Sequence, residues 1–289
     1  MALTVVSTSD VRLALHDLGG NGPRTLLVGH GTGFHGRAYQ PLIVHLRGFR
    51  AWAPDLRAHG DSTSPRDSHF AWEGLAEDME AAIAEIADGS PLYAFGHSMG
   101  SAVSLFVEAR RPGTFKAIYG FEPIVVPPEA PRPKPDQRSV WIEGTRKRRR
   151  DFPSLADAVE NFSGKAPFAG WTRESLLAYL EHGFHRRDGG AISIKMDPED
   201  EARMYQMSPN PIWDHLHLVA CPVVVASGKP APSTPSAWAA RVAKQIPRAR
   251  LETYDDLTHM GPFEAPERIA EAAQRFFDQV DADARAAVT

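Results

Sequence analysis

The chain has almost no cysteine: Cys221 is the single one among 289 residues. An internal disulfide and a zinc site built on cysteines are therefore excluded. No apolar run approaches the roughly eighteen residues that a membrane-spanning helix needs, and the amino terminus lacks the basic and apolar regions of a signal peptide. The net charge of −4 argues against a nucleic-acid surface. We therefore expect a cytoplasmic protein with no membrane span and no nucleic-acid partner.

Motifs for cofactors and metals are scarce as well. No phosphate-binding loop of the G-x-x-x-x-G-K-[ST] type occurs, and we expect no cofactor. His182 and His185 have the helical spacing of a metal-binding pair, but no carboxylate motif accompanies them. We expect no metal, and no pattern in the chain indicates an oligomeric state.

The composition is that of an ordinary globular protein, with 43% hydrophobic and 24% charged residues. Short β-rich runs alternate with segments of helical periodicity in the first half and again toward the carboxyl terminus. The expected strands are 5–6, 11–16, 25–28, 50–53, 92–95, 117–121, 223–226 and 250–254. This alternation predicts the α/β class, with a doubly wound and mostly parallel sheet that an antiparallel pair of strands enters.

The alternation stops between the sixth and seventh of these strands, from Val125 to His217. The stretch opens with a proline-rich segment, continues with helical patterns, and holds one weak strand at 192–194. We predict a helical cap at 125–217, inserted into a core formed by 1–124 and 218–289. Within it the basic run Arg146–Arg150 is either a solvated helix face or a site for an acidic substrate tail or partner.

The sequence Gly96-His97-Ser98-Met99-Gly100 matches G-x-S-x-G between a predicted strand and a predicted helix. Such a turn holds its middle residue in a strained backbone conformation, with the side chain clear at the tip. The helix that follows directs unpaired N–H groups toward any charge that forms beside Ser98. Ser98 is therefore the predicted nucleophile.

A second glycine-rich loop, Gly29-His30-Gly31-Thr32-Gly33, follows the strand TLLV. Its glycines allow the backbone to approach a ligand closely. The N–H groups of Thr32 and Met99 would together form an oxyanion hole, with Gly33 as a substitute donor.

These motifs make the chain resemble the α/β-hydrolase fold superfamily over nearly its whole length. Four segments carry the resemblance: the G-x-S-x-G turn at 96–100, which we call the elbow, the glycine-rich loop at 29–33, DLRAHGDS at 55–62 and THMGPFEAP at 258–266. It implies that His259 is the general base and that the insertion is a cap over the active site. The remaining motif and junction histidines are interpreted as structural or surface groups: His30, His59, His97, His215 and His217.

A histidine base needs a carboxylate that orients its ring. In most α/β-hydrolases this acid follows the strand after the cap, here 223–226, yet no Asp or Glu occurs between residues 221 and 251. Glu122 ends the preceding strand, a position that many haloalkane dehalogenases use for the acid. We therefore predict Glu122 as the acid, with Asp255 and Asp256 as the alternatives.

A serine with a histidine base attacks carbonyl carbon and forms an acyl-enzyme that water hydrolyses. The resemblance implies a carboxylesterase-like serine hydrolase acting on an ester, thioester or lactone of a small-molecule acyl substrate. A carbon–carbon bond hydrolase or a cofactor-free haloperoxidase of the same fold is one alternative, and a non-catalytic ligand-binding protein is another. Six apolar cap residues either line an acyl pocket or pack the cap onto the sheet: Trp141, Phe162, Phe168, Trp171, Met204 and Met207.

Overall fold

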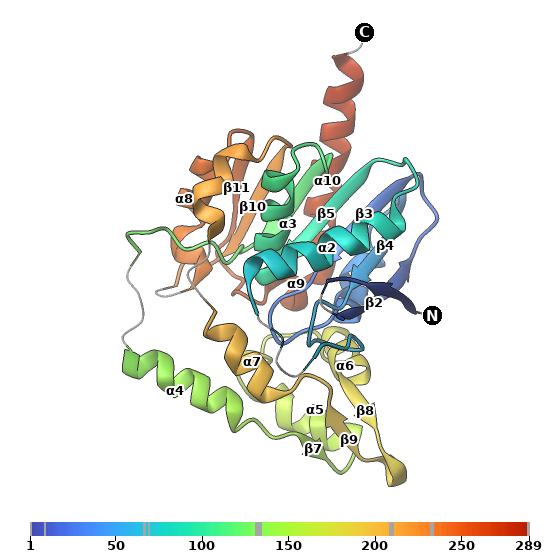
Figure 1. The fold of residues 1–289 in the computed structure, drawn as a ribbon, viewed down its shortest axis with the longest axis vertical. Coiled ribbons are helices and arrows are strands. Elements are labelled where there is room, and N and C mark those ends of the chain that lie inside the picture. Colours follow the sequence, from blue (N-terminus) through green and yellow to red (C-terminus); the bar gives the residue numbers. More distant parts are fainter. Residues whose placement is uncertain are drawn as a thin grey trace.

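The computed structural model describes residues 2–8, 10–65, 68, 70–130, 135–207, 211–231 and 234–287, without the side chains of 135–139 and 141. Its main element is an eight-stranded sheet in the order β1-β2-β4-β3-β5-β6-β10-β11 (Figure 1). The two pairings of β2 are antiparallel and the other five are parallel. The predicted α/β class and the entering antiparallel pair are confirmed.

The strands of this sheet lie close to the predicted runs. They are β1 (Ala2–Val6), β2 (Arg12–Gly19), β3 (Arg24–Gly29), β4 (Phe49–Pro54), β5 (Leu92–His97), β6 (Ala117–Phe121), β10 (Val223–Gly228) and β11 (Ala249–Tyr254). The helices packed around them are α1 (Gln40–Ile43), α2 (Trp72–Ile86), α3 (Met99–Arg110), α8 (Ala239–Gln245), α9 (Gly261–Glu264) and α10 (Pro266–Ala286), with the 3-10 helices η1 (Gly36–Tyr39) and η4 (Pro235–Trp238).

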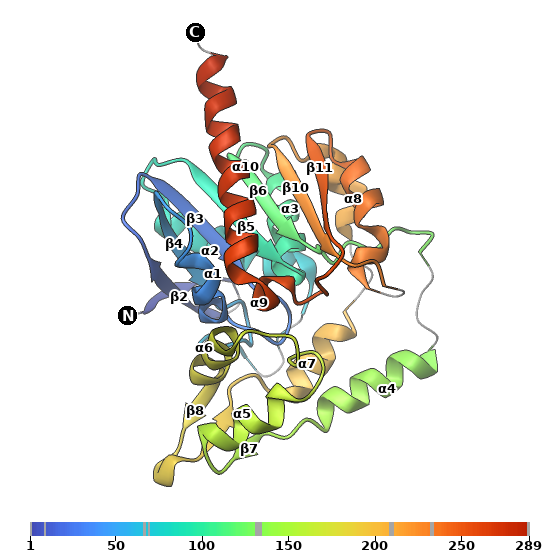
Figure 2. The same cartoon turned by 180° about the vertical axis from the view of Figure 1, so that it is seen from behind.

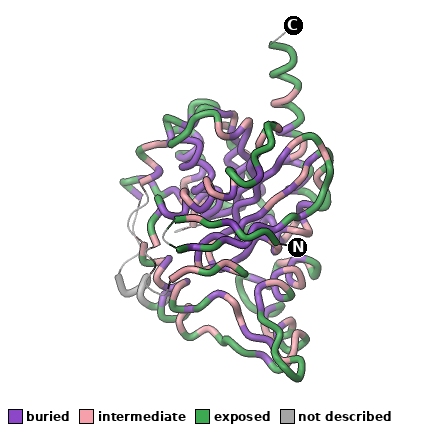
Figure 3. The backbone as a smooth tube through the Cα atoms, turned by 45° about the vertical axis from the view of Figure 1, so that its right-hand side comes forward, coloured by how far each residue is buried: buried purple, intermediate pink, exposed green. Residues whose placement is uncertain are grey.

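The central strands are buried on both faces, as a parallel sheet covered by helices requires. Side chains alternate between the faces, so Leu26 and Val28 join one apolar cluster whereas Leu27 joins the other. Helices α1 and α10 supply the first cluster, and α2, α3 and α8 supply the second. Figure 3 shows buried backbone concentrated in this layered core and the outer end of α10 exposed.

The insertion lies between β6 and β10 and forms a separate body against one edge of the sheet (Figures 1 and 2). It contains α4 (Pro135–Arg146), α5 (Leu155–Ser163), α6 (Arg173–Gly183), α7 (Pro198–Tyr205) and the 3-10 helix η2 (Asp188–Gly190). The 3-10 helix η3 (Pro211–Leu218) then returns to the core, where its Ile212 and Leu216 pack among residues of α3 and α8.

The cap also holds a small three-stranded sheet, of which the sequence analysis expected one strand. Strand β9 (Ile192–Ile194) matches the weak strand that was predicted. Its antiparallel partners β7 (Asp151–Phe152) and β8 (Phe184–Arg186) were missed. Each of these two strands holds a single apolar residue, Phe152 or Phe184, so neither shows the alternation that Ile192 and Ile194 give to β9.

The basic run Arg146–Arg150 is in part solvent-exposed, but it is not a free cationic patch. Three of its four arginines pair with acidic residues in the first turn or at the N-cap of α7, which lies beside α4 in Figures 1 and 2. The N–O distances are 2.7 Å for Arg146–Glu199, 2.6 Å for Arg148–Glu201 and 2.6 Å for Arg150–Asp197. We call these three contacts the arginine ladder, and it joins two segments of the cap.

Within the described residues, every helix is too short or too polar to span a bilayer.

Replacing Phe277 by alanine should lower the free energy of unfolding by about 3–5 kcal/mol, because the ring is fully buried and its loss leaves a cavity. Its centroid lies 5.5 Å from that of Phe49 and 5.1 Å from that of Tyr93. Urea denaturation measures the change. The control is Arg285→Ala on the exposed end of the same helix, expected within about 0.5 kcal/mol of the parent. Equal stability of the two variants would contradict this account of α10.

Candidate active site

Ser98 stands in the turn between β5 and α3 with φ 55° and ψ −116°. This conformation is rare for a residue with a side chain and costs on the order of 1–3 kcal/mol. The backbone is held from both sides: the Ser98 N–H donates to the Phe121 carbonyl at 2.9 Å, and the Ser98 carbonyl accepts from Ala102 and Ile124 at 3.1 and 3.2 Å. The turn thus places the hydroxyl at the carboxyl edge of the sheet.

Two glycines of the elbow are required by close approach rather than by their own dihedral angles. A Cβ atom on Gly96 would lie 2.4 Å from the Cα atom of Ser101, and one on Gly100 would lie 2.1 Å from the carbonyl carbon of Gly29. A side chain at either position would push α3 away from the sheet. The elbow pattern therefore corresponds to a real steric constraint.

The three residues predicted as nucleophile, base and acid lie in one hydrogen-bonded row. His259 Nε2 is 3.1 Å from Ser98 Oγ, and His259 Nδ1 is 2.7 Å from Glu122 Oε2. Because a carboxylate accepts, Nδ1 carries the proton and Nε2 faces the hydroxyl as an acceptor. Ser98 and Glu122 are buried and the His259 side chain is 22% exposed.

Glu122 is fixed by the strand that usually carries the acid. Its backbone N–H donates to the Ala226 carbonyl at 2.8 Å, and its Oε1 accepts from the Gly228 N–H at 2.9 Å. Both carboxylate oxygens are thus hydrogen-bonded, as full burial of this side chain requires. The alternative acids are exposed, and Asp256 forms its ion pair with Arg268 at 2.6 Å.

Two N–H groups of the glycine loop are already hydrogen-bonded within the protein. The Gly31 N–H donates to the Tyr39 hydroxyl at 3.1 Å, and the Gly33 N–H donates to His59 Nε2 at 3.1 Å. Gly33 is therefore not an available substitute donor, which corrects the expectation from sequence. The N–H groups of Thr32 and Met99 have no hydrogen-bond partner in the part of the chain that the structure describes. Thr32 Oγ1 lies 3.3 Å from Met99 Sδ, so the two residues are in contact.

The buried histidines around this loop serve as neutral hydrogen-bonding groups. His30 donates through Nδ1 to the Gly31 carbonyl and accepts at Nε2 from the Leu56 N–H. His59 donates through Nδ1 to the Arg57 carbonyl while Nε2 accepts from the loop. Burial lowers the pKa of His30, and burial with the nearby His30 lowers the pKa of His59 to about 3. Both rings therefore stay uncharged near neutral pH.

Three aromatic rings pack together where cap and core meet. Trp171 of the cap stacks on Phe263 with centroids 4.0 Å apart, and Phe34 lies 5.7 Å from Trp171 and 5.2 Å from Phe263. The Thr172 N–H also donates to the Phe263 carbonyl at 3.0 Å. We call Phe34, Trp171 and Phe263 the aromatic roof.

Among the apolar cap residues singled out in the sequence, Trp171 thus contacts Phe263 of α9, the helix that follows His259. Phe162 and Phe168 pack inside the cap with centroids 4.8 Å apart, and Met204 is buried. Met207 packs against the core, and the side chain of Trp141 lies outside the described residues.

The Arg148–Glu201 pair of the arginine ladder lies against the glycine loop. A Cβ atom on Gly33 would lie 2.5 Å from Glu201 Oε1, so this carboxylate rests on the loop. Arg148 and Glu201 are close, but their N–H and lone-pair directions do not make a hydrogen bond. Burial raises the pKa of Glu201, against the lowering effect of Arg148. The Tyr205 hydroxyl donates to Glu201 Oε1 at 3.2 Å.

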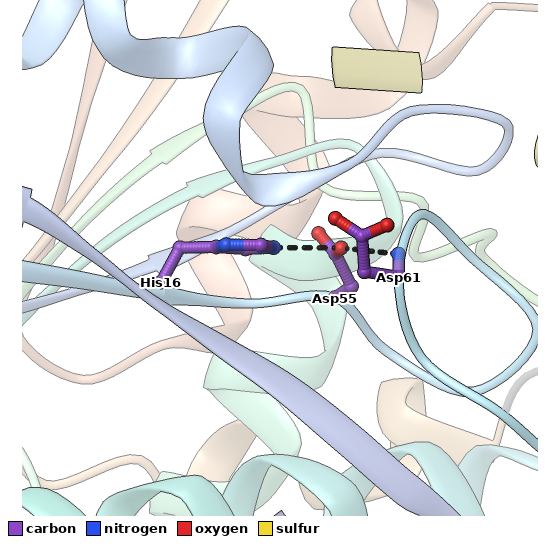
Figure 4. A group of neighbouring side chains, drawn as sticks. All are labelled: His16, Asp55 and Asp61. Atoms are coloured by element: carbon purple, nitrogen blue, oxygen red, sulfur yellow. Dashed lines mark hydrogen bonds and ion pairs between the residues drawn. The ribbon is translucent and has the colours of Figure 1, made fainter. Parts of the chain in front are cut away.

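A cluster of His16, Asp55 and Asp61 is compact enough to hold an ion, but its ligand atoms are occupied (Figure 4). Asp55 Oδ2 accepts from His16 Nε2 and from the Asp61 N–H, both at 2.8 Å, and Oδ1 accepts from the Gly36 N–H at 2.7 Å. The Asp61 carboxylate pairs with Lys195 of the cap at 2.6 Å. The cluster therefore braces the loop after β4.

Sequence reasoning missed the partners that hold this site in place. Tyr39 contacts both the glycine loop and His97, yet a tyrosine in a helical pattern reads as an ordinary core residue. Phe34 and Phe263 are next to motif residues in the sequence and contact each other in the structure. Their positions along the chain do not indicate that they also contact the cap. The N–H of Gly228 is invisible in a sequence because every residue except proline has one.

With the elbow, the histidine and the cap in place, the comparison with known proteins is decisive for the family. The model of the alpha/beta hydrolase family matches residues 26–272. The chain belongs to the alpha/beta hydrolase family. The fold is also that of the peroxisomal alpha-beta-hydrolase Lpx1 from Saccharomyces cerevisiae, with a TM-score of 0.78 and 15% identity over 97% of this chain and 85% of that one.

Curated relatives of this hydrolase-family chain match over part of their length. Lipase LipV from Mycobacterium tuberculosis is 32% identical over 115 residues, which cover 40% of this chain and 43% of that protein. Monoglyceride lipase from Homo sapiens is 31% identical over 111 residues, 36% of each protein. The chain thus aligns with less than half the length of these relatives.

The Asp55→Asn variant should lose about 3–5 kcal/mol of stability, because it leaves His16 and two N–H groups with a weaker buried partner. Burial alone would raise the pKa of Asp55, but the hydrogen bond and charge of His16 hold it below its usual range. Since the folded pKa is depressed, this stabilisation is present above about pH 4 and is lost as the pH falls below it.

Thermal denaturation across pH 3–7 checks both parts. The melting temperature of the variant should fall less steeply between pH 4 and pH 3 than that of the parent, because the variant has no carboxylate at this position to protonate. The matched control is Asp61→Asn, whose half-exposed carboxylate makes one ion pair and is expected to contribute at most about 1 kcal/mol. Similar losses in the two variants would refute the bracing role of Asp55.

Proposed function

We propose that the protein is a serine hydrolase that cleaves a carboxylic ester or a related acyl bond, such as a thioester or lactone, through an acyl-enzyme. The observation that carries the proposal is the row Ser98–His259–Glu122, with contacts of 3.1 and 2.7 Å and a strained serine at its end. Membership of the hydrolase family and partial similarity to two lipases support it.

In this proposal His259 Nε2 removes the proton of Ser98 Oγ as the oxygen attacks the substrate carbonyl carbon. Glu122 holds the ring in the required tautomer and stabilises the imidazolium. The leaving alcohol or thiol takes the proton from His259, and the acyl group stays on Ser98. A water molecule, deprotonated by His259, then attacks the acyl carbon and releases a carboxylic acid and the free serine.

The developing oxyanion would accept hydrogen bonds from the N–H groups of Thr32 and Met99. Two features support this assignment. Both groups lack a hydrogen-bond partner among the described residues, and Met99 begins α3, whose amino-terminal dipole favours negative charge. The N–H groups on either side of Thr32 already donate elsewhere, so the loop offers this one donor at the site.

The surroundings of Ser98 favour a substrate with an apolar acyl or alcohol group. Phe34 packs 6.1 Å from the ring of His97, the neighbour of Ser98, and its contacts with Phe263 and Trp171 extend these aromatic surroundings to the cap. A panel of esters of increasing chain length, lactones and a vinylogous diketone tests this. Cleavage of the diketone alone would indicate a carbon–carbon bond hydrolase instead.

Ser98→Ala should lower turnover by at least about 10³-fold while leaving the fold intact, because the nucleophile is gone. The purified parent should also be labelled stoichiometrically by a fluorophosphonate, and the variant should not be labelled. Mass spectrometry of the labelled peptide locates the adduct. An adduct elsewhere, or wild-type turnover in the folded variant, would refute the scheme.

Glu122→Gln should reduce turnover by about 10⁴-fold, because an amide N–H facing Nδ1 forces the histidine into the wrong tautomer. Gly228 can still donate to the amide oxygen, so the fold should survive. Asp255→Asn and Asp256→Asn are the matched controls, since both carboxylates are exposed. Steady-state ester hydrolysis measures all three. If Asp255→Asn or Asp256→Asn loses ester hydrolysis while Glu122→Gln retains it, the assignment of Glu122 as the acid is wrong.

A further inference from the structure

His97 precedes Ser98 in the elbow, and both nitrogens of its buried ring are engaged. Nε2 lies 2.8 Å from the backbone carbonyl of His259, the predicted base. A carbonyl only accepts, so Nε2 carries the proton and donates it to this carbonyl. In the neutral ring Nδ1 is then an acceptor, and the Tyr39 hydroxyl lies 2.7 Å from it.

The direction of the remaining bonds follows from the Tyr39 hydroxyl. It accepts the Gly31 N–H at 3.1 Å, which leaves its own proton for His97 Nδ1. Three hydrogen bonds therefore run in one sense, from Gly31 to Tyr39, from Tyr39 to His97 and from His97 to the carbonyl of His259. We call this row the His97 chain.

The His97 chain joins three separate parts of the site. Gly31 belongs to the loop that presents Thr32, His97 belongs to the elbow, and His259 belongs to the loop between β11 and α9. Tyr39 is 1% exposed and His97 is fully buried, with the Phe263 ring centroid 5.7 Å from that of His97. The bonds from Gly31 to Tyr39 and from Tyr39 to His97 are buried, so water does not compete for them and they hold their direction.

The charge state of His97 fits this arrangement. Burial lowers the pKa of His97 well below its ordinary value, and the neighbouring rings of His259 and His30 lower it further. The Tyr39 hydroxyl is also kept protonated, since burial raises its pKa. A neutral His97 does not repel the imidazolium that forms on His259, although the two ring centroids are 4.9 Å apart.

We propose that His97 is a positioning residue, which acts with Tyr39 to fix the backbone of His259 so that its Nε2 meets Ser98 Oγ. The inference rests on the proposed function and adds to it a residue outside the row of three. Glu122 orients the ring of His259 from one side. His97 fixes the main chain from which that ring projects. A displacement of about 1 Å at a reacting group can cost about 10²-fold in rate.

The test compares His97→Gln with His97→Leu in the full-length protein. The side-chain amide of glutamine reaches about as far as imidazole Nε2 and can donate to the His259 carbonyl, whereas leucine fills space without a donor. We expect leucine to slow phosphonylation of Ser98 by a fluorophosphonate about 10- to 100-fold, and glutamine to stay within a few-fold of the parent. In ester hydrolysis the loss should appear in kcat with little change in KM.

Two further variants sharpen the comparison. Tyr39→Phe keeps the ring and removes the hydroxyl, so it should slow labelling although residue 97 is unchanged. His215→Leu is the matched control, because its Nδ1 donates to the Pro211 carbonyl at 2.9 Å and its ring packs on Phe106, away from Ser98. Its labelling rate should equal that of the parent.

Each outcome bears on a stated claim. A folded His97→Leu protein that is labelled as fast as the parent would overturn the positioning role and leave the proposed function standing. A parent that is not labelled at all would overturn the proposed function and the positioning role with it. If leucine prevents folding, His97→Asn replaces it, since its shorter amide cannot reach the carbonyl. Asparagine slower than glutamine supports the proposal, and equal rates refute it.

Discussion

The steric constraint at the Ser98 turn organises the rest of the site. A positive φ at a serine persists only where its surroundings hold it, and here β6 and α3 bind the serine backbone on both sides. The same turn brings α3 so close to β3 that the backbones at Gly100 and Gly29 leave no room for a Cβ atom. The glycine loop after β3 is therefore held beside the serine, and the amino end of α3 is directed at the same point.

The buried Glu122 shows how neighbouring strand ends share one task. Strands β6 and β10 pair in parallel with Phe121 opposite Ala226, so their ends lie about 4.8 Å apart. A carboxylate on β6 can then use an N–H of β10 and still reach His259. Full burial of a carboxylate costs free energy unless its oxygens are hydrogen-bonded, and both are. An acid at the end of β6 is thus held by the backbone of β10.

The cap uses two kinds of contact that serve different ends. The arginine ladder pairs basic and acidic side chains within the cap, so those charges stabilise its internal arrangement instead of forming a patch. The aromatic roof instead joins the cap to the core, with Trp171 stacked on Phe263 directly beyond the histidine loop. The Thr172 N–H donates to the Phe263 carbonyl beside this stack, and Lys195 pairs with Asp61 of the core, so apolar and polar contacts together hold the cap against the core.

The sequence by itself determined the layered sheet, the place of the insertion and the elbow, because periodicity and closely spaced glycines are local properties. It also pointed to Glu122, since the usual acid position holds no carboxylate. Only the tertiary structure decided which N–H groups of the glycine loop are open, since His59 takes one and Tyr39 another. It likewise decided the partners of Arg146–Arg150, the strands β7 and β8, and the His97 chain. These features depend on contacts between segments far apart along the chain, and local residue patterns do not record which segments will meet.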